Sequence, residues 1–407
     1  MSLKGTRVGI IGGSIAGCAA AAALSRAGLD VQVFERSSKG LRDRGSGIGI
    51  PGPLRTKLME QGYLAQGFPT CPRTKRYWLF PDGTRDGRNL WTQASPVFAN
   101  NWGNLWRELR NLVPDALYHE GKKLSSFQQS ADAVTVQFAD GTQDAFDLLV
   151  GADGYNSAIR QAMHPGSQPQ YAGYILWRGN YPEAELADHE LIRKTDDDEA
   201  WLTMPFPGGH GIMYMIPDFD GNNQRGGRRV NWAIYAPCPQ ALTLEGVESI
   251  PPGAVSEAAH GELLQILDQH FPPSSRDLVA HTRREDVSIQ PIYDSIVDSY
   301  VDRRLMLIGD AGSIPRPHTA SGATKALEDA LALEAIAKQA DDLPELLARY
   351  DQERCAAART ISEIGRRIGQ AQVVDTPNWG QMTPADFEAF IKNILSGEKL
   401  YLYGDQD

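Results

Sequence analysis

The stretch Arg7-Val-Gly-Ile-Ile-Gly-Gly-Ser-Ile-Ala-Gly17 decides the fold of this chain. The apolar run in residues 7–11 predicts a short buried strand, and the glycines that follow predict a turn. Residues 16–27 are rich in alanine and predict a helix. A second strand is expected at residues 31–34, directly before Glu35. The segment therefore predicts a strand-helix-strand unit of about 30 residues.

The glycines of this turn have the spacing of a Rossmann-type dinucleotide site. Gly12 is expected to make the tight turn, and Gly17 lets the helix pack close to the strand. The helix N-terminus then offers free amides to a pyrophosphate, and Glu35 can accept from ribose hydroxyls. Ser14 replaces the second glycine of the usual fingerprint, a turn without a ligand is the alternative, and the motif does not separate NAD from FAD. The residues predicted to bind here are Gly12, Gly13, Ser14, Ile15, Ala16, Gly17, Glu35 and Arg36.

Length and composition limit the cellular compartment and the kinds of binding partner that are expected. The 407 residues, 42% of them hydrophobic and 22% charged, predict a packed protein of two domains. A net charge of -11 without a basic stripe argues against binding to nucleic acid. The four cysteines lack the spacing of metal ligands, so we expect no metal and a cytoplasmic location. Residues 8–24 are uncharged, but glycines interrupt them and they are short for a membrane span, which argues against export and against a membrane partner.

Two more loops are expected to follow buried strands. Residues 146–150 predict a strand that returns from a hairpin and leads into Gly151-Ala-Asp153-Gly154, before a helix opened by Ser157 and Arg160. Residues 304–308 predict another strand, which leads into Gly309-Asp310-Ala311. As single motifs, both loops are also compatible with ordinary turns.

The rest of the chain divides into a β-rich part and a helical part. Between residues 171 and 284, short strand-like segments alternate with proline and glycine, which predicts a mostly β domain. Residues 324–339 and 344–370 predict helices by composition.

The three loops, in this order and at these separations, resemble the group A FAD-dependent aromatic hydroxylases, the p-hydroxybenzoate hydroxylase-like superfamily. The resemblance spans nearly the whole chain. The Gly-Gly-Ser turn, the segment Tyr171-Ala-Gly-Tyr-Ile-Leu-Trp-Arg-Gly179 and Pro315-Arg-Pro-His318 are most similar to the hydroxypyridine branch, which includes 2,6-dihydroxypyridine 3-monooxygenase and 6-hydroxynicotinate 3-monooxygenase. Two positions depart from the family pattern: Trp102 stands where members often carry arginine, and Ser313 stands where they usually carry histidine.

The resemblance implies an α/β fold in which the domains are interleaved. A Rossmann-type FAD-binding domain, with a parallel sheet and a ββα meander, would comprise residues 1–70, 100–165 and 285–340. A mostly β substrate-binding domain would comprise residues 71–99 and 166–284. Helices and a tail would follow in residues 341–407.

The resemblance also implies the cofactors and the residues that hold them. FAD would stay bound, and NADH or NADPH would dock transiently as hydride donor, since no second Rossmann fingerprint is present. The loop at Gly45-Ser-Gly-Ile48 would lie beneath the flavin, and the helix starting near Gly322 would direct its positive end at the pyrimidine ring. Beyond the first turn, the implied cofactor-binding residues are Gly47, Ile48, Trp102, Asp153, Gly154, Arg160, Gly309, Asp310, Pro317, Ser321, Gly322, Ala323 and Thr324.

By the same resemblance, the reaction is hydroxylation of an electron-rich aromatic or heteroaromatic ring by O2 through a flavin C4a-hydroperoxide. His210 and Tyr214 are four residues apart, which places them on one face of a strand. We expect His210 to relay a proton or anchor the ring and Tyr214 to form a hydrogen-bonding wall. Pro317 and His318 are expected over the isoalloxazine. A loop histidine and a core tyrosine are the structural alternatives.

Several alternatives stay open at this stage. Trp177 and Trp201 are candidates for the cavity wall or for the core. The fold would also suit an FAD-dependent dehydrogenase or reductase, or a flavin-binding protein without turnover. The partners expected are a small aromatic substrate and O2, and a homodimer is compatible with the sequence.

Overall fold

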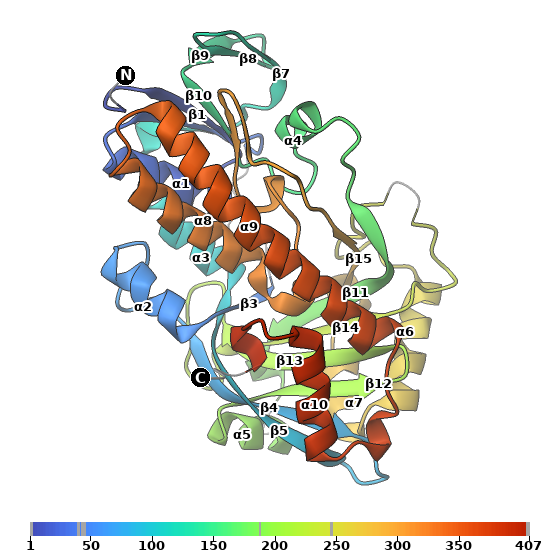
Figure 1. Ribbon diagram of the computed structural model, residues 1–407. Helices are drawn as coiled ribbons and strands as arrows, with labels where there is room; N and C mark the ends of the chain where they lie inside the picture. Colours follow the sequence, from blue (N-terminus) through green and yellow to red (C-terminus); the bar gives the residue numbers. More distant parts are fainter. Residues whose placement is uncertain (1–2, 39–40, 42–45, 187–188, 245–246, 404–407) are drawn as a thin grey trace.

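The computed structural model describes residues 3–38, 41, 46–186, 189–244 and 247–403. Within these residues the chain forms a six-stranded sheet, an eight-stranded sheet and a three-stranded sheet (Figure 1). Helices cover the sheets, and the C-terminal helices lie across both larger ones (Figure 1). The predicted α/β class, with a Rossmann-type parallel sheet, further β structure and C-terminal helices, is confirmed.

The six-stranded sheet is the Rossmann-type core. Its order is β16-β17-β10-β1-β2-β6, and all neighbours run parallel except β16 and β17. The predicted strand-helix-strand unit is confirmed at its centre by β1, α1 and β2. The strands are β1 Arg7–Ile11, β2 Asp30–Phe34, β6 Tyr118–His119, β10 Leu148–Gly151, β16 Val301–Asp302 and β17 Leu305–Leu307.

Small side chains let the first helix lie against a second one. Helix α1 (Ile15–Arg26) carries a run of buried alanines and packs against α8 (Ser321–Ala337). Alanine has no side chain beyond Cβ, so the two helix backbones approach closely at little cost in side-chain entropy. Helix α3 (Trp102–Arg110) contacts α1 as well. The result is one apolar core beneath the parallel sheet.

The pairing predicted for residues 146–150 is wrong. The strand that returns from the hairpin after β8 is β9, not residues 146–150, and β10 joins the parallel sheet instead. Asp147 separates the two strands, and its carboxylate accepts from the Arg7 amide at 2.8 Å. Strand β10 is buried throughout, as a central parallel strand must be. The three-stranded sheet consists of β7 Leu124–Gln129, β8 Val134–Phe138 and β9 Gln143–Phe146.

The eight-stranded sheet has the order β15-β11-β14-β13-β12-β4-β5-β3 and is antiparallel except between β12 and β4. It includes two strands from segments that the sequence assigns to the FAD-binding domain, β3 and β15. The division into domains stays a prediction. The strands are β3 Gly47–Ile50, β4 Cys71–Phe80, β5 Arg88–Asn101, β11 Gln170–Pro182, β12 Ala200–Phe206, β13 Gly209–Pro217, β14 Arg228–Ala236 and β15 Ser288–Asp294.

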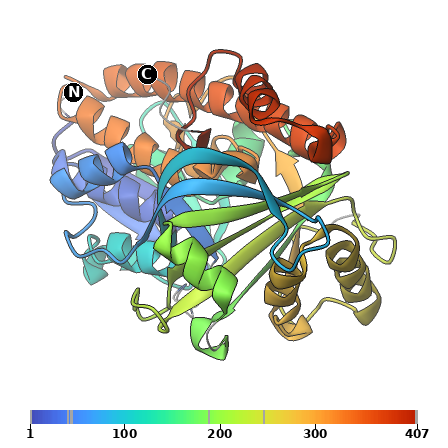
Figure 2. The ribbon, with the colours of Figure 1, turned by 90° about the horizontal axis from the view of Figure 1, so that it is seen from below.

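Helices cover both faces of the large sheet (Figure 2). One face packs against α6 and α7, and the other packs against the end of α9 and against α10. The region predicted as mostly β therefore also contains α5, α6 and α7. The remaining α-helices are α2 Gly52–Glu60, α4 Ala158–Met163, α5 Glu190–Asp197, α6 Glu257–His270, α7 Pro273–Ala280, α9 Leu343–Gly369 and α10 Pro384–Leu395.

Helix α9 joins the two larger sheets. Its first half buries Leu346 and Tyr350 in the core of the parallel sheet, and its second half buries Ile364 and Ile368 against the large sheet. A π-helix, η6 (Gln370–Val374), continues it. The short helices are η1 Asp115–Leu117, η2 Glu183–Glu185, η3 Arg284–Asp286, η4 Gly309–Ala311, η5 Pro317–Thr319, η7 Trp379–Gln381 and η8 Tyr401–Tyr403.

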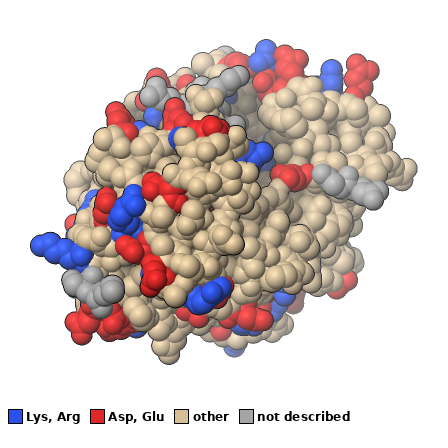
Figure 3. All heavy atoms as spheres, turned by 90° about the horizontal axis from the view of Figure 1, so that it is seen from above, with Lys and Arg blue, Asp and Glu red and all other residues tan. Residues whose placement is uncertain are grey.

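The surface carries charges of both signs. On the face shown in Figure 3, lysine and arginine side chains lie interspersed with aspartate and glutamate. In the described part of the chain, no helix combines the length and the apolar character needed to cross a membrane.

A buried ionic network holds the loop after β17. Asp329 is fully buried and accepts from the Gly309 amide at 3.1 Å, from Lys325 Nζ at 3.0 Å and from Arg354 Nε at 2.7 Å. Lys325 Nζ also donates to the Gly309 carbonyl at 2.8 Å. The network therefore fixes Gly309 to α8 and α9.

We expect Asp329→Asn to lower the free energy of unfolding by roughly 3–5 kcal/mol, because two buried cations lose their counter-charge. Urea denaturation measures the loss. The control is Arg349→Gln, which breaks an exposed pair with Glu345 and should cost less than about 1 kcal/mol. Equal losses of unfolding free energy in the two variants would contradict the role of Asp329 as the counter-charge of the buried cations.

Candidate active site

Three strand-end loops meet at one edge of the parallel sheet. Strands β17, β10 and β1 are neighbours and run parallel, so their carboxyl ends lie side by side. The loops that follow begin at Gly12, Ala152 and Ile308. Backbone hydrogen bonds join them, from the Ala152 amide to the Ile11 carbonyl at 2.8 Å and from the Ile308 amide to the Gly151 carbonyl at 3.0 Å. The three segments singled out in the sequence therefore form one site.

The first loop needs its glycines. Gly12 has a φ of +105°, and a Cβ there would lie 2.2 Å from the Ala152 carbonyl oxygen. A Cβ on Gly17 would lie 1.8 Å from the Gly12 carbonyl oxygen. The tight turn and the close helix packing predicted for these two residues are both present.

Two features around the first loop suit a nucleotide. Glu35 is buried, and its two carboxylate oxygens accept from the amides of Gly13 and Ser37, each at 2.8 Å. Each oxygen keeps a lone pair that can accept from a ribose hydroxyl. The Ser14 side chain makes no capping bond to α1, so Ile15 and Ala16 start the helix without a side-chain cap. Arg36 is exposed next to this group.

The second loop holds a carboxylate that is only half satisfied. Asp153 Oδ2 accepts from the Ala158 amide at 2.8 Å, whereas buried Oδ1 has no hydrogen-bond partner among the described residues. Burial raises the pKa of the Asp153 carboxyl. Gly154 follows with a φ of +76°, which favours glycine. The unpaired Oδ1 marks a place where a donor from a bound group would fit.

Arg160 connects the second loop to the third. It is fully buried, and its guanidinium donates to the carbonyls of Asp310 at 2.9 Å and Ala311 at 3.1 Å, and to that of Tyr155. These contacts position both loops. The predicted direct contact of Arg160 with the cofactor stays a prediction.

The third loop leads to the N-terminus of α8. Gly309 has a φ of +61°, and burial raises the pKa of the adjacent Asp310 carboxyl. Helix α8 follows Ala320, a left-handed residue that cannot cap it with its side chain. The predicted residues Ser321, Gly322, Ala323 and Thr324 form the first turn of this helix.

The predicted loop beneath the flavin is the strand β3. Gly45 lies outside the described residues, while Gly47 and Ile48 begin β3. A Cβ on Gly47 would lie 2.6 Å from the Tyr214 ring, so this glycine permits a close approach. Trp102 is the first residue of α3, and its amide donates to the Ser46 carbonyl at 3.3 Å. Strand β3 is therefore the edge strand of the large sheet, and Trp102 follows β5 directly. The contact of both segments with a cofactor stays a prediction.

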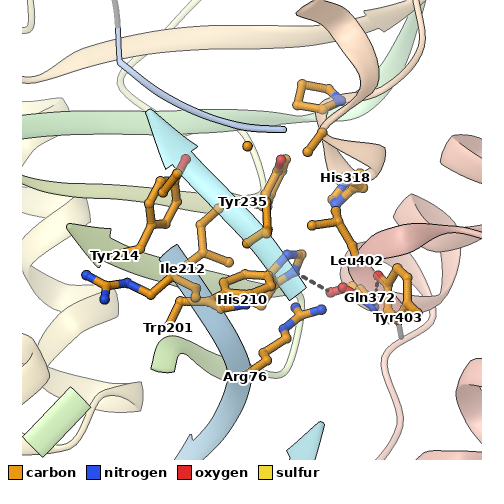
Figure 4. Close-up of a pocket in the computed structure, with 16 residues that line it drawn as sticks. Arg76, Trp201, His210, Ile212, Tyr214, Tyr235, His318, Gln372, Leu402 and Tyr403 are labelled. Carbon is orange, nitrogen blue, oxygen red and sulfur yellow. Dashed lines mark hydrogen bonds between the residues drawn. The ribbon is translucent and has the colours of Figure 1, made fainter. Parts of the chain in front are cut away.

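A cavity that is partly open to solvent lies between the large sheet and the C-terminal helices (Figure 4). All four residues predicted to be catalytic line it: His210 and Tyr214 from β13, and Pro317 and His318 from η5. Trp201 lines the cavity as well, whereas Trp177 is fully buried in the core of the large sheet. The other lining residues are Gly49, Arg73, Arg76, Val97, Ala99, Ile212, Tyr235, Ala320, Gln372, Leu402 and Tyr403.

His210 is a neutral acceptor in this cavity. Burial, together with the nearby positive charge of Arg76, lowers the pKa of His210 to about 3. Its Nδ1 lies 3.4 Å from the Gln372 carbonyl oxygen in the π-helix η6. A carbonyl only accepts, so Nδ1 carries the proton and Nε2 keeps its lone pair.

His318 carries a polar atom without a partner. Its ring stacks on Tyr235 with 3.9 Å between centroids, and its Nε2 lies 2.8 Å from the Tyr174 hydroxyl. Burial lowers the pKa of His318 well below its usual value, and buried Nδ1 has no hydrogen-bond partner among the described residues. Like Asp153 Oδ1, this nitrogen suits a bound polar group.

Tyr214 lies on the same face of β13 as His210, with Ile212 between them. The even spacing predicted one face of a strand, and the cavity lining confirms it. Burial raises the pKa of Tyr214 to about 12, so the hydroxyl stays protonated and can donate a hydrogen bond.

Sequence reasoning missed several cavity residues. Tyr235 pairs with His210 across β14 and β13, but its register is visible only in the structure. Arg76 is on β4, and Gln372 and Tyr403 come from the C-terminal part. Their positions depend on strand order and on the return of the chain end, for which no local motif exists.

The buried histidines make stability depend on pH. In the unfolded chain His210 titrates near 6.5 and in the folded protein near 3, so the unfolded state binds more protons between these values. The contribution of neutral His210 to stability is therefore fully present above about pH 6.5, and it is lost as the pH falls toward 3. Urea unfolding at about pH 7 and at about pH 5 tests this. On going from pH 7 to pH 5, we expect the free energy of unfolding of His210→Gln to fall by roughly 2 kcal/mol less than that of the wild type. If acidification lowered the free energy of unfolding equally in the wild type and in His210→Gln, His210 would not be neutral and buried in the folded protein.

Comparisons with known proteins agree with this geometry. Residues 10–39 match the model of the NAD(P)-binding Rossmann-like domain, and residues 171–294 match that of the FAD binding domain-like family. The chain is 31% identical over 352 residues to 2,6-dihydroxypyridine 3-monooxygenase from Paenarthrobacter nicotinovorans, covering 84% of this chain and 85% of that protein. It is 27% identical over 365 residues to the FAD-dependent urate hydroxylase of Klebsiella pneumoniae, covering 86% of each.

The solved structures agree as well. The 2,6-dihydroxypyridine-3-hydroxylase from Arthrobacter nicotinovorans superposes with a TM-score of 0.81 at 25% identity, covering 95% of this chain and 96% of that one. The glycine turn, the unpaired Asp153 oxygen and the uncapped helix starts fit FAD as the bound group. The chain therefore belongs to the family of FAD-dependent aromatic hydroxylases.

Proposed function

We propose that this protein is an NAD(P)H-dependent monooxygenase that hydroxylates an electron-rich aromatic or heteroaromatic ring, such as a hydroxypyridine or a phenolic acid. The observation that carries the proposal is the cavity, where the helix after the third cofactor loop meets His210 and Tyr214 of the large sheet. The names of the relatives, which specify a dihydroxypyridine and urate, support a ring substrate of this kind.

FAD, when bound, supplies a hydride acceptor for NAD(P)H and activates O2. Per turnover, one oxygen atom replaces a ring hydrogen as a hydroxyl group and the other leaves as water, while NAD(P)H and a proton supply the two electrons and the hydrogen atoms. The first turn of α1 would hold the phosphates of FAD, and the first turn of α8 would face its flavin ring. Asp153 and Asp310 would accept hydrogen bonds from polar groups of FAD.

His210 would act on a ring hydroxyl. Its Nε2 accepts a hydrogen bond from that hydroxyl, which increases the electron density of the ring. As negative charge develops on the ring oxygen, the pKa of the neighbouring imidazole rises, and transfer of the proton becomes more favourable. Tyr214 would donate to a second polar group on the ring and so fix its orientation.

The other walls of the cavity keep water away from the reaction. Tyr235, Trp201 and Ile212 present apolar surface to the cavity, and Leu402, from the last part of the chain, also lines it. Exclusion of water strengthens the polar interactions inside the cavity and protects reactive species from side reactions.

Purified, FAD-loaded protein tests the proposal in a screen of phenols, hydroxypyridines and aromatic acids. We expect at least one compound to accelerate NADH or NADPH oxidation, and mass spectrometry with ¹⁸O2 should find one labelled oxygen atom in the product. Accelerated oxidation without label would instead indicate a dehydrogenase or reductase on the same scaffold. A protein that binds FAD but responds to no ring compound would indicate a flavin-binding protein without turnover.

With a substrate found, His210→Gln should lower kcat/KM by about 100-fold or more, because the proton acceptor is lost. Steady-state kinetics across a pH series measures the change. The matched control is His260→Gln on α6, outside the cavity, which should keep wild-type kinetics. A His210→Gln enzyme with unchanged kcat/KM would rule out the role in proton transfer.

A further inference from the structure

The carbonyl oxygen of Gly13, in the first cofactor loop, accepts hydrogen bonds from three buried side chains. Trp106 Nε1 donates to it at 2.9 Å, the Tyr118 hydroxyl at 3.0 Å and Cys18 Sγ at 3.2 Å. Trp106 and Tyr118 are only 4% and 6% exposed. A thiol is a weak donor, so the indole and the hydroxyl are the main partners of the two carbonyl lone pairs. Side chains of α3 and β6 therefore hold the Gly13 carbonyl in the interior.

The held carbonyl determines the direction of the amide that follows it. The Gly13–Ser14 peptide is trans, so the Gly13 carbonyl and the Ser14 N–H point in opposite directions. Because the carbonyl points at buried donors, the Ser14 amide points away from them. Ser14 is half-buried between buried Gly13 and buried Ile15, and its amide has no acceptor among the described residues. Such an amide is available to a bound anion.

The two preceding amides of the loop are already occupied. The Gly12 amide donates at 2.9 Å to the carbonyl at the end of β2, and the Gly13 amide donates at 2.8 Å to the Glu35 carboxylate. A Cβ on Gly13 would lie 2.2 Å from the Tyr118 hydroxyl oxygen, so this hydroxyl packs directly against the turn. Ser14 therefore presents the first amide of the loop that is left for a ligand.

The two main donors are themselves held in place. Arg110 follows Trp106 by one turn of α3, and its guanidinium lies 4.0 Å from the centre of the Tyr118 ring. Burial raises the pKa of Tyr118, so its hydroxyl stays protonated and can donate. Helix α3 directly follows β5, the longest strand of the large sheet. The support of the glycine turn is therefore continuous with that sheet.

We propose that Trp106 and Tyr118 are positioning residues of the FAD site: by holding the Gly13 carbonyl inside, they direct the Ser14 amide toward the pyrophosphate of FAD. This inference goes beyond the proposed function and rests only on the binding of FAD. Without these donors the peptide can rotate, and a carbonyl oxygen would then replace the N–H at the pyrophosphate. The partial negative charge of that oxygen would repel the anion.

Titration of the FAD-free full chain with FAD, followed by flavin fluorescence, tests this inference. Tyr118→Phe removes a single oxygen atom and should raise Kd for FAD by about 3- to 10-fold, because a charge-assisted hydrogen bond is weakened. Combining it with Trp106→Phe should raise Kd by about 20-fold or more. In ³¹P NMR of the FAD-loaded proteins, the pyrophosphate resonances of both variants should move from their wild-type positions.

Matched controls separate this role from the loss of any buried hydrogen bond. The Tyr181 hydroxyl donates to the Leu278 carbonyl at 2.7 Å, and Trp379 Nε1 donates to the Phe206 carbonyl at 3.2 Å. Both side chains are buried, and both lie in core clusters separate from that of the parallel sheet. Tyr181→Phe and Trp379→Phe should lower Tm as their counterparts do, but keep the wild-type Kd for FAD and the wild-type ³¹P spectrum.

Three results would overturn the inference: a wild-type Kd for FAD in the combined variant, a raised Kd with unmoved ³¹P resonances, or equal effects on FAD binding in Tyr118→Phe and Tyr181→Phe. The second result would indicate a role in stability alone. If the combined variant does not fold, Tyr118→Phe decides. None of these measurements involves turnover, so a protein that hydroxylates no ring would sink the proposed function and leave the role of Trp106 and Tyr118 standing.

Discussion

The parallel pairing of β17, β10 and β1 is the constraint on which the rest of the structure depends. Parallel strands must end at the same edge, so three loops that are far apart in the chain emerge together. Buried polar contacts then fix the loops to one another: Arg160 joins the second to the third, and Asp329 holds the third to α8 and α9. These contacts hold the three loops together at one edge of the parallel sheet.

The cavity depends on a second constraint, the position of the large sheet against the C-terminal helices. Strand β13 supplies His210, η5 supplies His318, and the π-helix after α9 supplies the carbonyl that fixes the tautomer of His210. A π-helix frees carbonyls from the regular α-helical ladder, and such irregularities often occur at functional sites. One long helix, α9, packs against both sheets and so connects the cofactor loops with the cavity.

The described residues that line the cavity are mostly aromatic or apolar. Two neutral histidines and a stacked tyrosine form an acceptor-rich wall, and Arg76 stands beside them as a positive charge. Elsewhere in the large sheet, Arg73 and Arg228 pair with acids.

The sequence by itself determined the Rossmann unit, the three loops and the face of β13, because glycine turns, strand ends and the two-residue period of a strand are local properties. It misassigned residues 146–150, because an apolar run does not reveal which partner it pairs with. Only the tertiary structure decided that β3 and β15 join the large sheet, and that Arg76, Tyr235 and Gln372 meet His210. Those contacts arise from strand order and long-range packing, which join residues that share no sequence pattern.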